Sequence, residues 1–311
     1  MLRDASYRFL PKPIINLVSL RKTKEDKRFG NWLTASQKVA ERLIEQKVES
    51  GGGQEKDKDI LSIIARSLAA EDPSKRLFPV EALSQMATII FAGHETTAST
   101  LNWLLYELSY NSKWQDRLIQ EIQDIRRQNG TNGPLTVKDL EGMPVLNAAI
   151  KETLRFHPIV AELVRESETD DIIPLECPIN DISGSVLREI PVTKGQRVVL
   201  NIFKYNRLKT VWGEDAEVWN PERFLGSNLS TTLGVFANLM TFSGGIRACI
   251  GWRFAVLELQ VVAVALIEFF KFSAVDGIEI EHVRVVTSPP MVKGRWEAGP
   301  QLPLKVALRS A

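Results

Sequence analysis

The alternation of hydrophobic and polar positions predicts a chain built mostly from helices. Residues 22–48 are charged but repeat apolar side chains at helical spacing, which is typical of an amphipathic helix. Residues 79–109 are apolar on nearly all sides, so we expect a long buried helix that starts at Pro79. A capping-box pattern predicts a short helix after Thr136. Further helical patterns cover residues 59–70, 112–128, 144–156 and 249–271.

The pattern changes after Pro158. Residues 159–205 alternate short apolar segments with Pro, Gly and Asp, which is typical of strands and turns. Residues 206–248 are mostly irregular, and an irregular stretch of this length is usually functional. We therefore expect a mainly α fold with small β-sheets, in a single domain over residues 1–311. Small strands near the end are predicted at 283–286, 291–295 and 302–308.

Composition and charge narrow the classes of protein. Hydrophobic residues make up 44% and charged residues 25%, which is ordinary for a globular protein. A formal net charge of +1 does not favour nucleic acid as a partner or electrostatic membrane binding. Charged residues interrupt the first twenty positions and the apolar stretch 254–270, so we expect no signal peptide or transmembrane segment in this chain. Two cysteines do not make a disulfide framework and favour a reducing compartment.

One of the two cysteines, Cys249, follows a glycine-rich segment. Residues 242–251 read Phe-Ser-Gly-Gly-Ile-Arg-Ala-Cys-Ile-Gly. Glycines let a backbone turn tightly against a flat ligand, and a cysteine that opens a helix has its sulfur at the end of the helix dipole that favours a thiolate. Arg247 adds positive charge. The alternative for such a cysteine is a buried structural role, and we interpret Cys177 in that way, without a function.

The segment resembles the haem-binding loop of the cytochrome P-450 family, with the pattern F-x-x-G-x-R-x-C-x-G. The defined positions are filled by Phe242, Gly245, Arg247, Cys249 and Gly251. The resemblance implies heme b (iron-protoporphyrin IX) bound through the Cys249 thiolate, with Arg247 on a haem propionate and Phe242 near the sulfur. A thiolate ligand suits a haem iron for cleavage of O–O bonds.

The long predicted helix contains Ala-Gly-His-Glu-Thr-Thr at residues 92–97, which resembles the oxygen-activation motif of the family. Polar groups in an apolar helix must be satisfied, and a Thr96 hydroxyl bonded to the carbonyl four residues earlier would open the helix locally. By resemblance, Glu95 and Thr96 are catalytic and relay protons, which is a general-acid task. The alternative is a polar kink without catalysis. His94 lacks a second ligand at metal spacing and is interpreted as structural.

Glu152 and Arg155 stand at i,i+3 spacing, so they share one face of a helix. Such a pair is commonly a surface salt bridge. In the family it joins an arginine of a later Pro-Glu-Arg-Phe segment, found here at 221–224, and the resemblance therefore implies a structural triad with Arg223. Arg165 matches a position that binds the other propionate, with an exposed strand arginine as the alternative.

The substrate pocket is also suggested by position. By the same alignment, the apolar run between Pro158 and Arg165 would line the distal pocket, where Glu162 would need a partner for its charge. The turn at 296–301 is expected to line the pocket as well. Before residue 79 only the helix at 22–48 matches a family element, the last helix over the pocket. We therefore expect a P-450 fold that lacks much of its N-terminal part.

The resemblance covers nearly the whole chain, and its motifs are closest in style to eukaryotic, fungal members. It implies a haem monooxygenase that inserts one oxygen atom from O₂ into a small apolar substrate, with electrons from an NADPH-dependent reductase. The alternatives are a non-catalytic truncated fragment that binds haem weakly or not at all, and a rearrangement without a reductase. Full-length relatives are expected at the endoplasmic reticulum membrane, and membrane association of this chain only through a missing N-terminal anchor.

Overall fold

The computed structural model describes residues 24–49, 57, 59–74, 76–130, 133–226, 233–283 and 287–309. The chain forms two compact units, residues 1–95 and residues 96–311, and the boundary between them falls within the long helix α5 (Pro79–Tyr110). The expectation of a single domain stays a prediction. Among the described residues, we find no helix with the length and apolar character needed to cross a membrane.

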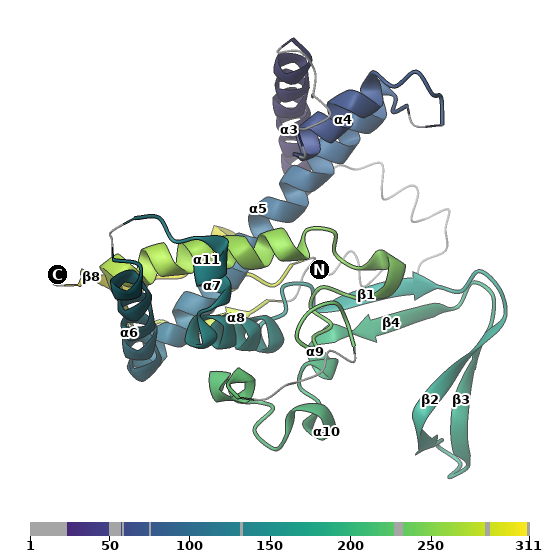
Figure 1. Cartoon of the computed structure of the whole chain (residues 1–311). Coiled ribbons are helices and arrows are strands. Elements are labelled where there is room, and N and C mark those ends of the chain that lie inside the picture. The colour runs from purple at the N-terminus through teal and green to yellow at the C-terminus, as the bar shows by residue number, and fades with distance from the viewer. Residues whose placement is uncertain are drawn as a thin grey trace. The chain divides into compact units, whose positions relative to one another are not determined.

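The first unit contains α3 (Lys24–Glu49), α4 (Ile60–Leu68) and the first part of α5, which confirms the helical patterns (Figure 1). Asp59 caps α4 because its carboxylate accepts a hydrogen bond from the Ser62 amide at 2.9 Å. We expected α5 to be buried throughout, and in this unit that was wrong: Val80 is 74% exposed. The reason is that α3 and α4 pack against one face of α5, through the small core of Ala40, Ile44, Ile64, Ala82 and Met86.

The second unit holds the rest of α5 and a group of helices that pack around one core (Figure 1). Its other helices are α6 (Ser112–Gln128), α7 (Val137–Glu141), α8 (Pro144–Phe156), α9 (Ile202–Tyr205), α10 (Lys209–Trp212) and α11 (Trp252–Phe269). The capping box at Thr136 is confirmed, since both of its reciprocal hydrogen bonds are present. Fully buried side chains at the centre of this core include Leu108, Leu118, Ile122, Leu146 and Leu259.

The strands of the described part pair into two-stranded antiparallel sheets. They are β1 (Glu162–Glu166) with β4 (Arg197–Asn201), β2 (Asp171–Asn180) with β3 (Val186–Val192), β5 (Phe270–Ala274) with β8 (Leu304–Leu308), and β6 (Ile280–His282) with β7 (Pro290–Val292). The expected mainly α fold with small sheets is confirmed. The helix predicted to reach Lys271 ends at Phe269, because the chain passes directly into β5. Of the strand predicted at 283–286, residues 284–286 lie outside the described residues.

A stack of rings joins α5, α8 and β6 in the interior. The Trp103 ring lies parallel to the rings of His157 and His282, with centroids 4.2 Å and 3.9 Å away. The Nε2 atom of His157 is 2.6 Å from the Glu107 carboxylate. Burial raises the pKa of Glu107 to about 7 and lowers the pKa of His157 well below its usual value. The interior therefore disfavours the charged form of both groups.

This cluster predicts a pH dependence of stability. The pKa of Glu107 is raised in the folded state, so its stabilising contribution is full below about 4.5 and is lost as the pH rises through about 7. Relative to a Glu107→Gln variant, the wild-type free energy of unfolding should therefore fall across this window, by on the order of 1–3 kcal/mol. Urea unfolding of both proteins at several pH values measures this difference. A difference that stays constant with pH would contradict the assigned shift.

Candidate functional site

The loop that carries Cys249 is closed by its own backbone. The Cys249 amide donates a hydrogen bond to the Phe242 carbonyl at 2.9 Å. Between them, Ser243 and Gly245 have φ values of 59° and 63°, in the left-handed region that costs a non-glycine residue energy. Gly245 opens a 3₁₀ turn, η2 (Gly245–Arg247). The predicted tight turn is therefore present and presents Cys249 at its end.

Cys249 does not open a helix, and that expectation was wrong. Helix α11 begins at Trp252, and its first described backbone bond runs from the Ala255 amide to the Gly251 carbonyl at 2.9 Å. The physical reason is local: Ala248 is extended (φ −61°, ψ 153°), and the Cys249 amide turns back to Phe242. The cysteine thus stands just ahead of the helix N-terminus.

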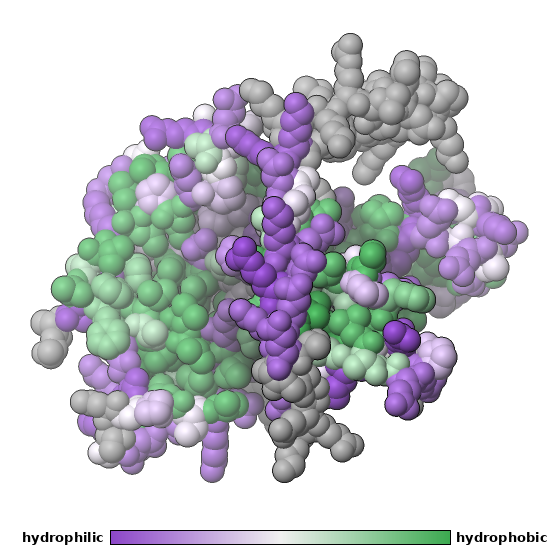
Figure 2. Space-filling view, turned by 90° about the horizontal axis from the view of Figure 1, so that it is seen from above, coloured by the Kyte–Doolittle hydropathy of each residue, from purple (hydrophilic) through white to green (hydrophobic). Residues whose placement is uncertain are grey.

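The surroundings of Cys249 are apolar and exposed. The cysteine itself is exposed, and Ile246 and Ile250, three residues before it and one after it, are 99% and 101% exposed. Cys177 is also exposed, so its expected burial was wrong, because the strand β2 that carries it is open to solvent along most of its length. Phe254, in the first turn of α11, is 70% exposed, and a Cβ added at Gly251 would meet no atom within 4 Å. A broad hydrophobic area is visible on the face of the molecule shown in Figure 2. Large apolar side chains around an open thiol fit a flat apolar group bound through sulfur better than a structural cysteine.

Helix α8 carries a buried ion pair. Glu152 and Arg155 have side chains that are 0% exposed, and the guanidinium meets the carboxylate through two bonds, at 2.7 Å (Nε–Oε2) and 2.8 Å (Nη2–Oε1). This bidentate geometry is the strongest arrangement for such a pair. The remaining N–H groups of Arg155 donate to the carbonyls of Asn206 and Ala216 at 2.7 Å and of Val218 at 3.0 Å. The surface alternative for this pair is therefore excluded by its burial.

The third predicted member lies beside this pair. Arg223, in the 3₁₀ turn η1 (Pro221–Phe224), has its Nε atom 3.6 Å from Glu152 Oε2 and its Nη2 atom 2.9 Å from Asp215. The Asn220 amide also donates to Glu152, at 2.8 Å. Hydrogen bonding from Asn220 and then the nearby Arg223 lower the pKa of Asp215. The structure thus brings Glu152, Arg155 and Arg223 together and ties the irregular segment after α9 to α8.

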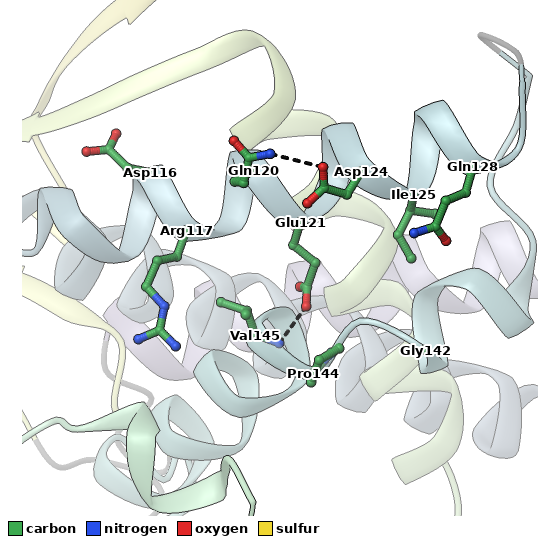
Figure 3. A pocket seen from close by; sticks show the side chains of 10 residues that line it. All are labelled: Asp116, Arg117, Gln120, Glu121, Asp124, Ile125, Gln128, Gly142, Pro144 and Val145. Atoms are coloured by element: carbon green, nitrogen blue, oxygen red, sulfur yellow. Dashed lines mark hydrogen bonds between the residues drawn. The ribbon is translucent and has the colours of Figure 1, made fainter.

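A carboxylate from another helix caps α8, which the sequence did not suggest. Met143, the N-cap residue, makes no side-chain cap bond. Instead, Glu121 of α6 accepts hydrogen bonds from the amides of Val145 and Leu146, both at 2.8 Å, and Figure 3 shows the first of these. Burial raises the pKa of Glu121. The shallow groove in Figure 3 lies beside this cap and contains none of the predicted site residues.

The remaining predicted cofactor contacts are at the surface. Arg165 lies on β1, is exposed, and donates to the Val164 carbonyl at 3.1 Å. Arg247 is also exposed. Glu162 is exposed on β1 opposite Asn201, so no buried charge needs a partner there. Of the expected pocket-lining run, Ile159 and Ala161 are buried and Val160 and Leu163 are half-buried.

The segment 92–97, which we predicted to be an oxygen-activation motif, lies in α5 and is α-helical without interruption. The expected local opening at Thr96 was therefore wrong, since a hydroxyl can share a helical carbonyl without breaking the ladder. One turn later, the Thr100 hydroxyl does so, donating to the Thr96 carbonyl at 2.9 Å. Glu95 and Thr96 are half-buried and His94 is exposed. The described residues contain no group of three or more His, Cys, Asp or Glu side chains arranged for a metal ion.

Comparison with known proteins shows the family of this chain. The sequence model of the cytochrome P450 family matches residues 6–291. The chain belongs to the cytochrome P450 family. It is 36% identical over 286 residues to cytochrome P450 monooxygenase 219 of Postia placenta, covering 88% of this chain and 51% of that protein. It is 35% identical over 280 residues to ganoderic acid synthetase CYP5150L8 of Ganoderma lucidum, covering 88% of this chain and 49% of that protein.

These matches are fungal, as expected from the motifs, and the chain spans about half the length of the curated relatives it matches. Membership of the cytochrome P450 family implies a haem cofactor held by a cysteine thiolate. Among the described residues of this cytochrome P450 chain, the exposed Cys249 of the loop at 242–251 is compatible with that role.

We expect a large loss of stability when the ion pair between Glu152 and Arg155 is broken, because both side chains are buried. Glu152→Ala leaves the Arg155 guanidinium in the interior without its carboxylate, which should lower the free energy of unfolding by about 3–5 kcal/mol. Lys305→Ala is the matched control, because it breaks a 2.7 Å ion pair to Asp276 that lies at the surface of the same unit, and it should change little. Chemical denaturation of the three proteins checks this. Equal losses in both variants would contradict the assigned role.

Proposed function

We propose that the Cys249 thiolate binds haem iron and that the protein acts as a haem monooxygenase. It would insert one oxygen atom from O₂ into an apolar organic substrate. The observation that carries the proposal is the exposed Cys249 at the end of a closed loop that contains the fully exposed Ile246, with the fully exposed Ile250 directly after it. A thiolate-bound haem supplies the cleavage of the O–O bond. The protein's own residues hold that group, exclude water and deliver protons.

Three apolar side chains and two arginines would hold the haem. Ile246, Ile250 and Phe254 would bury their exposed surface against the ring, at about 25 cal/mol for each Å² removed from water. Arg247 and Arg165 would pair with the two propionates, since a guanidinium matches a carboxylate in charge and geometry. Both arginines are exposed, so neither role requires a buried partner to be displaced.

Proton delivery is assigned to Glu95 and Thr96. Both are half-buried, and they are consecutive in α5, so an acid and an alcohol stand next to each other along the chain. The carbonyl of Thr96 already accepts the Thr100 hydroxyl, which holds the backbone at this point. Electrons are assigned to an NADPH-dependent reductase and the substrate class to small apolar molecules, by analogy with the family. The same analogy assigns the endoplasmic reticulum membrane as the location.

The spectrum of the reduced haem-loaded chain with carbon monoxide tests the proposal. Wild type should show the red-shifted Soret band of a thiolate-ligated complex. Cys249→Ser should lose that band, whereas Cys177→Ser, which changes another exposed thiol, on β2, should keep it. A wild-type band typical of histidine-ligated or free haem, or no retained haem, would instead support a non-catalytic fragment.

Thr96→Ala tests the proton assignment. With naphthalene as an apolar probe and a reductase, this variant should keep its haem but release several-fold more hydrogen peroxide for each NADPH consumed, because proton delivery is impaired. Thr88→Ala is the matched control, because Thr88 is an exposed threonine of the same helix whose hydroxyl donates to the Ser84 carbonyl at 2.8 Å. Unchanged coupling of electrons to product in Thr96→Ala would remove Thr96 from the relay.

A further inference from the structure

Asn206 connects the buried ion pair of Glu152 and Arg155 to the segment that leads into the Cys249 loop. It is 0% exposed and follows α9 directly. Its backbone carbonyl accepts a hydrogen bond from Arg155 at 2.7 Å. Its side-chain amide points the other way: Nδ2 donates to the Thr241 hydroxyl at 2.9 Å, and Oδ1 accepts from the Met240 amide at 3.4 Å. One residue therefore contacts both the ion pair and the residues just before the loop.

Thr241 closes this bridge. Its hydroxyl accepts from Asn206 and donates to the carbonyl of Leu154 at 2.7 Å, next to Arg155 in α8. The following residue is Phe242, whose carbonyl accepts the Cys249 amide at 2.9 Å. The connection thus runs from the guanidinium, through one asparagine and one threonine, to the bond that closes the cysteine loop.

The backbone before and within the loop adopts a conformation that other parts of the protein must hold in place. Ala237 and Asn238, ahead of the loop, and Ser243, within it, have φ values of 54°, 57° and 59°, which L side chains rarely adopt. Residues held in this region persist only where the surroundings fix them. The buried Asn206 amide is hydrogen-bonded through both its Nδ2 and Oδ1 atoms, and the half-buried Thr241 hydroxyl both accepts and donates, so another arrangement of this segment would lose these bonds.

We infer that Asn206, acting through Thr241, is a positioning residue that sets the Cys249 loop against α8 and thereby fixes the thiolate for its ligand. The positioning itself follows from the contacts of this chain alone, and the consequence for the ligand rests on the proposed function. Asn206 touches neither the thiol nor a cofactor, so its effect reaches Cys249 only through the loop.

Variants of the two residues separate this role from general stability. Asn206→Ala removes the amide, Thr241→Val removes the hydroxyl at nearly constant volume, and Thr241→Ser retains it. Gln115→Ala is the matched control, because Gln115 is a buried amide of the same unit with comparable bonds. Its side chain donates to the carbonyls of Leu108 at 2.7 Å and Phe272 at 2.8 Å, and accepts from the Phe272 amide at 3.0 Å.

Hydrogen exchange of the haem-free chain is the first readout. In Asn206→Ala and Thr241→Val, amides of residues 240–249 should exchange on the order of tenfold faster, because each loses buried hydrogen bonds that hold the segment. Thr241→Ser should match wild type, and Gln115→Ala should speed exchange near Phe272 but not at 240–249. Equal exchange at 240–249 in Asn206→Ala and Gln115→Ala would overturn the inference.

Iron ligation is the second readout. At equal haem content, the share of the reduced carbon monoxide complex with the thiolate-type band should fall several-fold in Asn206→Ala and Thr241→Val, and should be unchanged in Gln115→Ala. A wild-type-like share in Asn206→Ala would overturn the inference. If wild type itself lacks the band, the proposed function fails, and the exchange result alone decides the positioning role.

Discussion

The Arg155 guanidinium can lie in the interior because each of its five N–H groups has an acceptor. Two meet the Glu152 carboxylate, and three meet the carbonyls of Asn206, Ala216 and Val218. Removing a guanidinium from water is costly, and the cost is offset only where the whole donor set is paired. Arg155 therefore binds the irregular segment after α9 to α8 at three backbone carbonyls. This constraint orders a stretch that has little regular structure of its own.

The cysteine loop combines a fixed backbone with an exposed surface. Its entry is tied to α8 through Thr241, and its two ends are joined by the bond between Cys249 and Phe242. The side chains of Ile246, within the loop, and Ile250, just after it, are fully exposed to solvent. A site for a large flat ligand needs this division, because a rigid support sets the position of the sulfur and open apolar side chains supply contact area. In the function proposed above, the demanding chemical step belongs to the cofactor, and the protein would hold and shield it.

Much of this arrangement could be predicted from the sequence, because its signals are local. The helices at 112–128 and 144–156, the capping box at Thr136 and the mainly α class all follow from periodicity and capping residues. The start of α11 was misplaced because the amide of Cys249 is used by a carbonyl within the turn, which no pattern of apolar residues reveals. The capping of α8 by Glu121 and the hydrogen bonds of Asn206 to the segment before the cysteine loop join residues that are distant in sequence. No local sequence pattern therefore predicts them. Exposure of the first part of α5 was likewise a property of packing and not of composition.

The central claim is that the sulfur of Cys249 is the protein ligand of a haem iron. X-ray absorption at the iron edge of the haem-loaded chain tests this most directly, because it identifies the atoms in the first coordination shell. The account predicts one sulfur scatterer in the wild type and in Cys177→Ser, and its replacement by a lighter atom in Cys249→Ser. A first shell with nitrogen and oxygen alone in the wild type, or a sulfur that persists in Cys249→Ser, would contradict it.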